Sequence, residues 1–429
     1  MRSTVEAATG ARVPLWGNRN FALLCSGSIG SSLGNAVGYV VLTWLVYSAT
    51  RSPLAIALLG VVEFLPSALF GILGGALVDR FDRRRLMVAC DLGRFAILGA
   101  LAADVLVRGS NVVLVLAAAF AVSGLGTLFR PARNALLPRL VRSERLTDAT
   151  GLLESSGTAS SFVGSPLGGA LVVLLGALLG LALLLNALTF LVSAALLTWM
   201  VLPRRREAPA SPPEMRASLL AEAREGLRFL RSQTALLAIT ISALVANFFL
   251  AMYNGFEIFY VTQQLHLTVA VFGVLLAANT AGFAIGPLLP GRVGTDRAPG
   301  VWFAVATGCA GLSVVVLGLT AYLPLAVALA LLFAILQSFA GTCALSAEQR
   351  TVPEKVMGRY FATSEAGAFA MIPVGQIAGG FAVLLLGVGH TYVLAGVGGA
   401  FASFALLAIP SVRNWARLPA PGPARVSKA

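Results

Sequence analysis

Lysine and acidic residues are scarce in this chain. Only Lys355 and Lys428 occur among its 429 residues, and charged residues make up 11% of the sequence. A soluble domain would carry about 25% charged residues, so a soluble globular protein is excluded. Neither lysine closes a G-x-x-x-x-G-K-[ST] loop, so the sequence encodes no P-loop ATPase.

Cysteine and histidine are equally rare. The two histidines, His266 and His390, fall near the ends of apolar runs, where a hydrated surface position is expected. The cysteines lie inside apolar runs and have neither the pattern of a disulfide framework nor metal-ligand spacing; they are Cys25, Cys90, Cys309 and Cys343. With no nucleophile motif either, the sequence predicts no enzyme, no cofactor and no metal.

Long apolar runs fill the chain instead. Hydrophobic residues make up 58% of it, and its mean hydropathy is +0.86. The first run, Phe21 to Tyr47, is longer than a signal-peptide core of roughly 7 to 15 residues. A membrane-spanning helix needs about 20 apolar residues. We therefore predict an all-α membrane protein with twelve transmembrane helices, near residues 20–48, 53–78, 86–107, 111–130, 147–175, 178–202, 235–262, 269–290, 300–321, 324–346, 359–387 and 391–412.

The basic residues fall mostly in the loops on one side of the predicted membrane. The net charge is +13, and 28 of the 31 Lys and Arg fall in the termini and the loops between even and odd helices. Arg51 and Arg108 fall on the other side, and Arg94 lies inside the third helix. Because basic loops stay cytoplasmic, the pattern predicts a multi-pass protein of the inner (cytoplasmic) cell membrane with both termini inside. Membrane topology accounts for the basic excess, so no nucleic-acid partner is expected.

An internal repeat relates the two halves at an offset of 211 residues. Gly75 recurs as Gly286, Glu154 as Glu365, and the glycines of the fifth helix recur in the eleventh. Parallel six-helix repeats are one known way to build a transporter. We therefore predict two pseudo-symmetric six-helix bundles. The expected parts are an N-terminal segment 1–19, a first bundle 20–202, a linker with an amphipathic helix 203–234, a second bundle 235–412 and a disordered tail 413–429.

The segment Gly74 to Arg85 joins the second and third apolar runs with four arginines and two aspartates. It resembles the G-x-L-x-D-R-x-G-R-R loop of major facilitator superfamily transporters, and its DRFDRR variant is similar to the branch of enterobactin exporters and macrolide efflux pumps. The resemblance implies a cytoplasmic gate, because a carboxylate is favoured near a helix N-terminus. The expected gate and switch residues, with the same-face pair of helix 3, are Asp79, Arg80, Arg83, Arg84, Asp91 and Arg94.

Small residues on helices 5 and 11 predict close helix packing. The helix 5 pattern resembles the family's antiporter motif, but Ser160 and Ser165 replace its first glycine and its proline, with Pro166 one residue late. Antiport therefore does not follow from the motif alone. The expected packing residues are Gly75, Gly164, Gly168, Gly169, Gly375 and Gly379.

Glu154 and Glu365 fall close to the cytoplasmic ends of their predicted helices, where salt bridges to loop arginines are expected. Glu63 lies near the middle of helix 2, and Glu257 lies in the outer half of helix 7. Intramembrane carboxylates are costly and are functional suspects by default, although a structural role is the alternative for each. Glu63 and Glu257 are both hypothesised to carry a coupling proton. On an ideal helix, Asn247, Asn254 and Glu257 would share an arc of about 80°. With neighbouring aromatic residues, the expected substrate-cavity residues are Asn35, Tyr39, Asn247, Tyr253 and Asn254.

The sequence thus predicts a monomeric secondary active transporter whose partners are a small-molecule substrate, the proton and membrane lipid. A proton-coupled exporter (antiporter) of a hydrophobic or amphipathic compound is the first hypothesis, the cargo being a drug, a macrolide or a siderophore. Intramembrane carboxylates favour neutral or cationic cargo, which argues against an anionic siderophore. A nutrient importer of the same fold and a lipid-handling membrane protein remain alternatives. A sensor is disfavoured, since no loop is long enough for an output domain.

Overall fold

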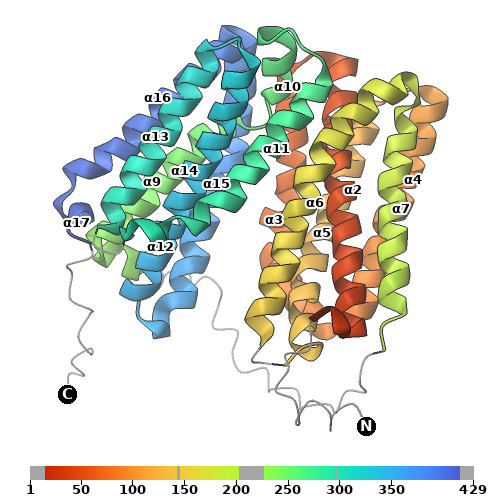
Figure 1. Cartoon of the computed structure of the whole chain (residues 1–429), viewed down its shortest axis with the longest axis horizontal. Coiled ribbons are helices and arrows are strands. Elements are labelled where there is room, and N and C mark those ends of the chain that lie inside the picture. The colour runs from red at the N-terminus through yellow and green to blue at the C-terminus, as the bar shows by residue number, and fades with distance from the viewer. Residues whose placement is uncertain (1–14, 143–144, 202–226, 296–297, 416–429) are drawn as a thin grey trace. The chain divides into compact units, whose positions relative to one another are not determined.

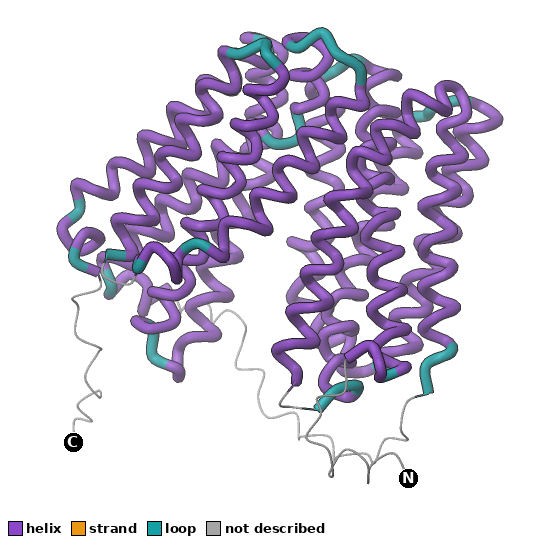
Figure 2. The backbone as a smooth tube through the Cα atoms, viewed as in Figure 1, coloured by secondary structure: helices purple, strands orange, loops and turns teal. Residues whose placement is uncertain are grey.

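The computed structural model describes residues 15–142, 145–201, 227–295 and 298–415. The side chains of residues 68–80 and of residues 354, 355, 358, 359, 362, 363, 365, 366, 368 and 369 fall outside the description. Within the described ranges the chain is helical and contains no strand (Figures 1 and 2). The all-α fold expected from the apolar runs is confirmed.

Six long helices come from the first half of the chain. The first two are joined by Arg51 and Ser52, and Asn111 caps the fourth by accepting hydrogen bonds from the backbone N–H groups of Val113 and Leu114. The third is capped by Asp82, which accepts from the Arg85 N–H. The bounds are α2 Arg19–Thr50, α3 Pro53–Arg80, α4 Arg83–Arg108, α5 Val112–Leu136, α6 Leu146–Leu175 and α7 Leu179–Thr198.

The second half supplies six more long helices and several short ones. The long helices are α9 Thr234–Tyr253, α11 Val269–Ile285, α13 Pro299–Leu319, α14 Leu323–Thr351, α15 Glu354–Leu386 and α16 Val388–Ala405. The short ones are α10 Glu257–Phe259, a π-helix Tyr260–Gln264, α12 Pro290–Val293 and α17 Pro410–Arg413. In the described chain, nine stretches are long and apolar enough to cross a membrane; one of them, Leu146–Thr198, contains both α6 and α7.

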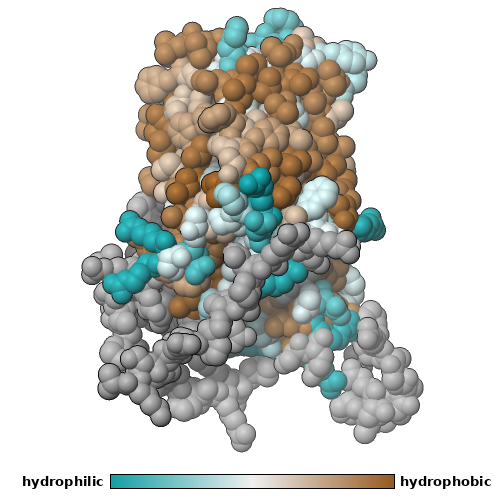
Figure 3. All heavy atoms as spheres, turned by 90° about the vertical axis from the view of Figure 1, so that its left-hand side faces the viewer, coloured by the Kyte–Doolittle hydropathy of each residue, from teal (hydrophilic) through white to brown (hydrophobic). Residues whose placement is uncertain are grey.

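Large apolar side chains cover much of the surface. Leu385 is 76% exposed and Phe401 is 75% exposed. On the face drawn in Figure 3 hydrophobic residues form a broad band, with some hydrophilic residues at the top edge and more of them toward the lower end. Helices satisfy their own backbone hydrogen bonds, so such an apolar surface is suited to lipid.

The chain divides into two compact units. The first consists of residues 1–42 and 65–208, and the second of residues 43–64 and 209–429. The boundary between units therefore crosses α2 and α3 instead of lying only in the linker. The last residues of α2 and the first residues of α3 belong to the same compact unit as the C-terminal helices.

Glycines allow equivalent close contacts within each unit. A Cβ atom at Gly164 of α6 would lie 2.8 Å from the Leu33 carbonyl oxygen of α2. A Cβ atom at Gly375 of α15, the equivalent position in the second half, would meet the Phe248 carbonyl oxygen of α9. In each unit the helix that carries the repeated glycines thus packs backbone to backbone on the first helix of its half, as expected for small residues in membrane helices.

Helix 7 departs from the prediction of one continuous helix over 235–262. The α-helix ends at Tyr253, Asn254 is extended with ψ 136°, and Gly255 has φ +94°. This left-handed backbone favours glycine, because other residues meet a steric penalty there. The shared arc predicted for Asn247, Asn254 and Glu257 is therefore wrong, since Asn254 and Glu257 stand on opposite sides of a break.

The packed part of the chain also extends further than expected at its C-terminal end. Trp415 lies within the predicted disordered tail 413–429, yet it is 2% exposed and its Nε1 donates to the Thr351 hydroxyl. Residues 416–429 lie outside the described residues, as does most of the linker. Within the predicted amphipathic helix, residues 227–232 are helical and Leu230 is buried in the C-terminal core.

Candidate functional site

The expected cytoplasmic gate is only partly visible. The side chains of Asp79 and Arg80 and the surroundings of Gly75 lie outside the described part of the structure, and Arg83 is half-buried. Arg84 binds the end of α7: its Nε donates to the Leu197 carbonyl at 2.7 Å, and a terminal nitrogen donates to the Thr198 carbonyl. A cation at a helix C-terminus is favoured by the helix dipole. Arg84 therefore ties α4 to α7, a role that the loop motif did not reveal.

Asp91 and Arg94 form a buried ion pair inside the first unit. Their closest nitrogen and oxygen are 3.6 Å apart, and the residues are 0% and 7% exposed. The Arg94 guanidinium lies 5.3 Å from the ring centre of Phe129 on α5 and 5.1 Å from that of Phe190 on α7. Gly126 of α5 leaves the space that the guanidinium occupies. The pair thus joins α4, α5 and α7 and is compensated within its own bundle.

Glu154 forms an ion pair near the end of α6. Its Oε1 is 2.5 Å from a terminal nitrogen of Arg133 on α5. A salt bridge to a basic residue of the loop side was the expectation for this carboxylate. Because Glu154 is half-exposed at its side chain, the pair contributes little stability, on the order of 0 to 1 kcal/mol.

Glu257 is the most enclosed carboxyl group among the described side chains of the second unit. It opens α10 directly after the break in helix 7 and is 5% exposed. Its Oε2 accepts a hydrogen bond of 2.7 Å from the Gly255 N–H. Among the described residues it forms no ion pair. An ionised carboxylate is costly in such surroundings, so a neutral Glu257 suits this arrangement.

Aromatic side chains pack beside Glu257. Tyr253 is 1% exposed, and its ring makes edge contacts with Phe333 of α14 at 5.2 Å and Tyr392 of α16 at 5.1 Å. Tyr392 in turn stacks on Tyr260 of the π-helix at 5.3 Å. These rings make a packed aromatic core in the second unit.

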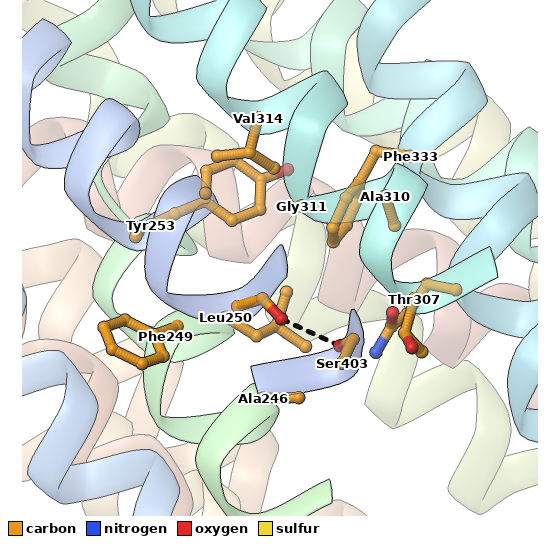
Figure 4. Close-up of a pocket in the computed structure, with 14 residues that line it drawn as sticks. Ala246, Phe249, Leu250, Tyr253, Thr307, Ala310, Gly311, Val314, Phe333 and Ser403 are labelled. Atoms are coloured by element: carbon orange, nitrogen blue, oxygen red, sulfur yellow. Dashed lines mark hydrogen bonds between the residues drawn. The ribbon is translucent and has the colours of Figure 1, made fainter. Parts of the chain in front are cut away.

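A small cavity of about 30 Å³ adjoins this core between α9, α13, α14 and α16 (Figure 4). Tyr253 lines it, and so do Thr307, Gln337 and Ser403. The Ser403 hydroxyl donates to the Gly399 carbonyl on its own helix. A water molecule needs roughly 10 to 15 Å³ of such volume and two to four polar partners. The cavity therefore has room for water and is too small for a drug-sized ligand.

The other predicted site residues are spread over both units. Asn35 is exposed on α2, while Tyr39 and Asn247 are half-buried. Glu63 is half-buried on α3, three residues before Pro66. None of these four lines the Figure 4 cavity.

Gln376 of α15 was missed by sequence reasoning. A Cβ atom at Gly60 would lie 2.7 Å from its amide oxygen, so Gly60 admits the amide against α3 one turn before Glu63. The sequence marks Gln376 only as a polar residue within an apolar helix, three residues before the pair Gly379 and Gly380.

The described part of the chain is helical, has apolar surfaces suited to lipid and repeats its glycine contacts in both units, as expected of a polytopic membrane protein. The chain matches the family model of the Major Facilitator Superfamily over residues 24–371, and it belongs to that superfamily.

Similar proteins include transporters from bacteria. The MFS-type transporter YfiS of Bacillus subtilis (strain 168) is 26% identical over 399 residues, covering 89% of this chain and 91% of YfiS. Macrolide efflux protein A of Streptococcus pyogenes is 23% identical over 380 residues, covering 88% and 92%. A bacterial homologue of the human lysosomal transporter Spinster, in an inward-facing and occupied conformation, has a TM-score of 0.73 at 14% identity, covering 94% of this chain and 98% of that one. The structural likeness shows the fold alone.

The orientation predicted from the charges can be tested by cysteine labelling. Ser110 precedes the Asn111 cap between α4 and α5, and Ala210 lies in the linker outside the described residues. In a cysteine-free background, a cysteine at position 110 should react with an impermeant maleimide added to intact cells. A cysteine at position 210 should react only after permeabilisation. The reverse pattern would show that the termini are outside.

Proposed function

We propose that this protein is a proton-coupled exporter of a small hydrophobic or amphipathic compound, neutral or cationic, that works by alternating access in the cytoplasmic membrane. The similarity to macrolide efflux protein A over most of both chains supports the direction and the cargo class. The observation that carries the coupling is Glu257, buried without an ion pair among the described residues.

The charge balance of the spanning helices supports the choice of cargo. Arg94, the basic residue predicted inside the third helix, is already paired with Asp91 and enclosed by two phenylalanine rings. The charge of Arg94 is therefore already neutralised by Asp91 and is not available to bind an anionic substrate. Glu257 forms no ion pair among the described residues, so it leaves an acidic group within helix 7, which favours cargo that is neutral or carries an amine.

Glu257 and Glu63 differ in burial, and therefore in how well each suits the role of proton carrier. Glu257 is enclosed, and moving its proton requires the site to become hydrated, as a transport cycle would allow. Glu63 is half-buried on α3 beside the distorting Pro66. We place the coupling proton on Glu257 first and on Glu63 second. Asn35, exposed on a spanning helix, is consistent with a water-filled substrate path, because polar groups in such helices face protein or water instead of lipid.

Transport by Gln variants in vesicles tests the proposal. Glu257→Gln should abolish uphill efflux of a cationic macrolide driven by an imposed proton gradient, since the amide cannot release a proton. Exchange of labelled for unlabelled substrate, which needs no net proton movement, should persist. Glu154→Gln, which alters a carboxyl already paired with Arg133, is the matched control and should pump normally. Wild-type uphill transport by both Glu257→Gln and Glu63→Gln would refute proton coupling through these groups.

A further inference from the structure

A direct contact joins the end of α2 to the segment that follows Glu257. The Tyr47 hydroxyl and the Thr262 hydroxyl are 2.7 Å apart. Thr262 uses its own proton to donate to the Ile258 carbonyl at 2.7 Å, so Tyr47 is the donor. The Tyr47 ring also makes an edge contact with Phe259 at 5.0 Å. Tyr47 is 2% exposed, and these contacts lie within the second compact unit.

The position of Thr262 depends on the break in helix 7. The Glu257 carboxyl accepts the Gly255 N–H, which the interrupted helix leaves without its regular partner. The following residues, Glu257 to Phe259, form α10, and the Ile258 carbonyl of α10 accepts a hydrogen bond from the Thr262 hydroxyl. The π-helix then carries Thr262 toward Tyr47, while Tyr260 donates to the Thr320 carbonyl of the helix end behind it. Thr262, which Tyr47 contacts, therefore lies only five positions after Glu257 in the sequence.

We propose that the proton on Glu257 and the Tyr47–Thr262 hydrogen bond stabilise one another. This inference rests on the proposed function. The closed arrangement buries Glu257 without an ion pair among described residues, so it favours the neutral acid. Separating α2 from the π-helix admits water to this end of helix 7, which favours the carboxylate. The two states then bind the proton with different affinity, and the linkage is reciprocal.

Other charged groups near Glu257 are few. Tyr253 on α9 is an ionisable side chain close enough for the charge of an ionised Glu257 to act on it. The helix packed against α10, α11, contains no ionisable residue. Arg51, which directly follows α2, lies over the Tyr47 ring at 5.1 Å from its centre. Two histidines also lie near this segment: His266 follows Thr262 by four residues, and His390 lies on α16, which packs against the π-helix. The Glu257→Gln variant therefore decides whether the closed contact responds to the carboxyl or to these imidazoles.

Distance measurements between spin labels test the linkage without substrate or gradient. Labels at Thr50→Cys and Leu267→Cys, in a background without the four native cysteines, report on the end of α2 against the end of the π-helix. The wild type should show the short distance at acidic pH and gain a longer one at alkaline pH. Glu257→Gln keeps an acceptor for Gly255 and stays neutral, so it should hold the short distance at every pH.

Removing the hydroxyl tests the other partner. Tyr47→Phe should lower the ratio of short to long distances about five-fold, the equivalent of one hydrogen bond of about 1 kcal/mol, and should weaken the pH response. Tyr322→Phe, in an exposed ring, is the matched control. An unchanged pH response in Glu257→Gln, or a wild-type ratio in Tyr47→Phe, overturns the inference. If the distances respond to pH but the protein transports no substrate, the proposed function is wrong while the linkage between Glu257 and the Tyr47–Thr262 contact holds.

Discussion

Replacing Asp91 by leucine should destabilise the protein by about 3 to 5 kcal/mol, because breaking a buried ion pair leaves an uncompensated charge. Arg94 keeps its charge at any accessible pH and sits 7% exposed between Phe129 and Phe190. The two rings attract the guanidinium by up to about 2 kcal/mol each, which does not replace a carboxylate. We expect a melting temperature lower by on the order of 10 °C, measured by size-exclusion chromatography of heated, detergent-solubilised protein.

The companion variants separate the charge from the loss of packing. Arg94→Met should cost less than Asp91→Leu, since a buried aspartate can take up a proton whereas the arginine cannot release one. The double variant Asp91→Leu/Arg94→Met should recover most of the loss, as replacing a whole buried pair is often neutral. Asp104→Ala breaks the pair with Arg108 on the same helix, where Arg108 is 79% exposed at its side chain, and should change stability by less than about 1 kcal/mol. A double variant as unstable as Asp91→Leu would contradict this account.

The second large effect is expected at Gly375. An added Cβ atom would lie 2.8 Å from the Ala251 Cβ and against the Phe248 carbonyl oxygen. Backbone cannot move aside as a flexible side chain can, so α15 must shift from α9. Gly375→Ala should therefore destabilise the second unit by roughly 1 to 3 kcal/mol, as over-packing does. The loss should appear as a lower melting temperature and as a smaller folded fraction on expression.

A glycine with free space around it provides the control. Gly341 of α14 has no atom within 4 Å of where its Cβ would lie. Gly341→Ala should stabilise the helix by about 0.5 to 1 kcal/mol, because alanine loses less conformational freedom on folding. Opposite signs for the two substitutions would identify close packing as the reason for Gly375. If Gly375→Ala were as stable as Gly341→Ala, the backbone contact between α15 and α9 would be looser than described.

Local sequence features determined much of the architecture. Apolar runs of spanning length predicted the positions of the long helices, because each helix satisfies its own backbone and needs only a lipid-compatible surface. The three-residue spacing of Asp91 and Arg94 placed both on one face of α4, since residues three apart are neighbours on a helix. The offset of 211 residues predicted equivalent glycine contacts, such as those of Gly164 and Gly375.

Tertiary structure alone decided the details of the site. Gly255 within an apolar run gave no sign that helix 7 breaks there, because glycine is also tolerated inside membrane helices. The Arg84 bonds to the end of α7 span 113 and 114 residues, and the contact between Tyr47 and Thr262 spans 215. Trp415 was assigned to a tail by its proline-rich neighbours, although it fills a gap near Thr351. Periodicity and composition report on one helix at a time, whereas these contacts depend on which helices pack together.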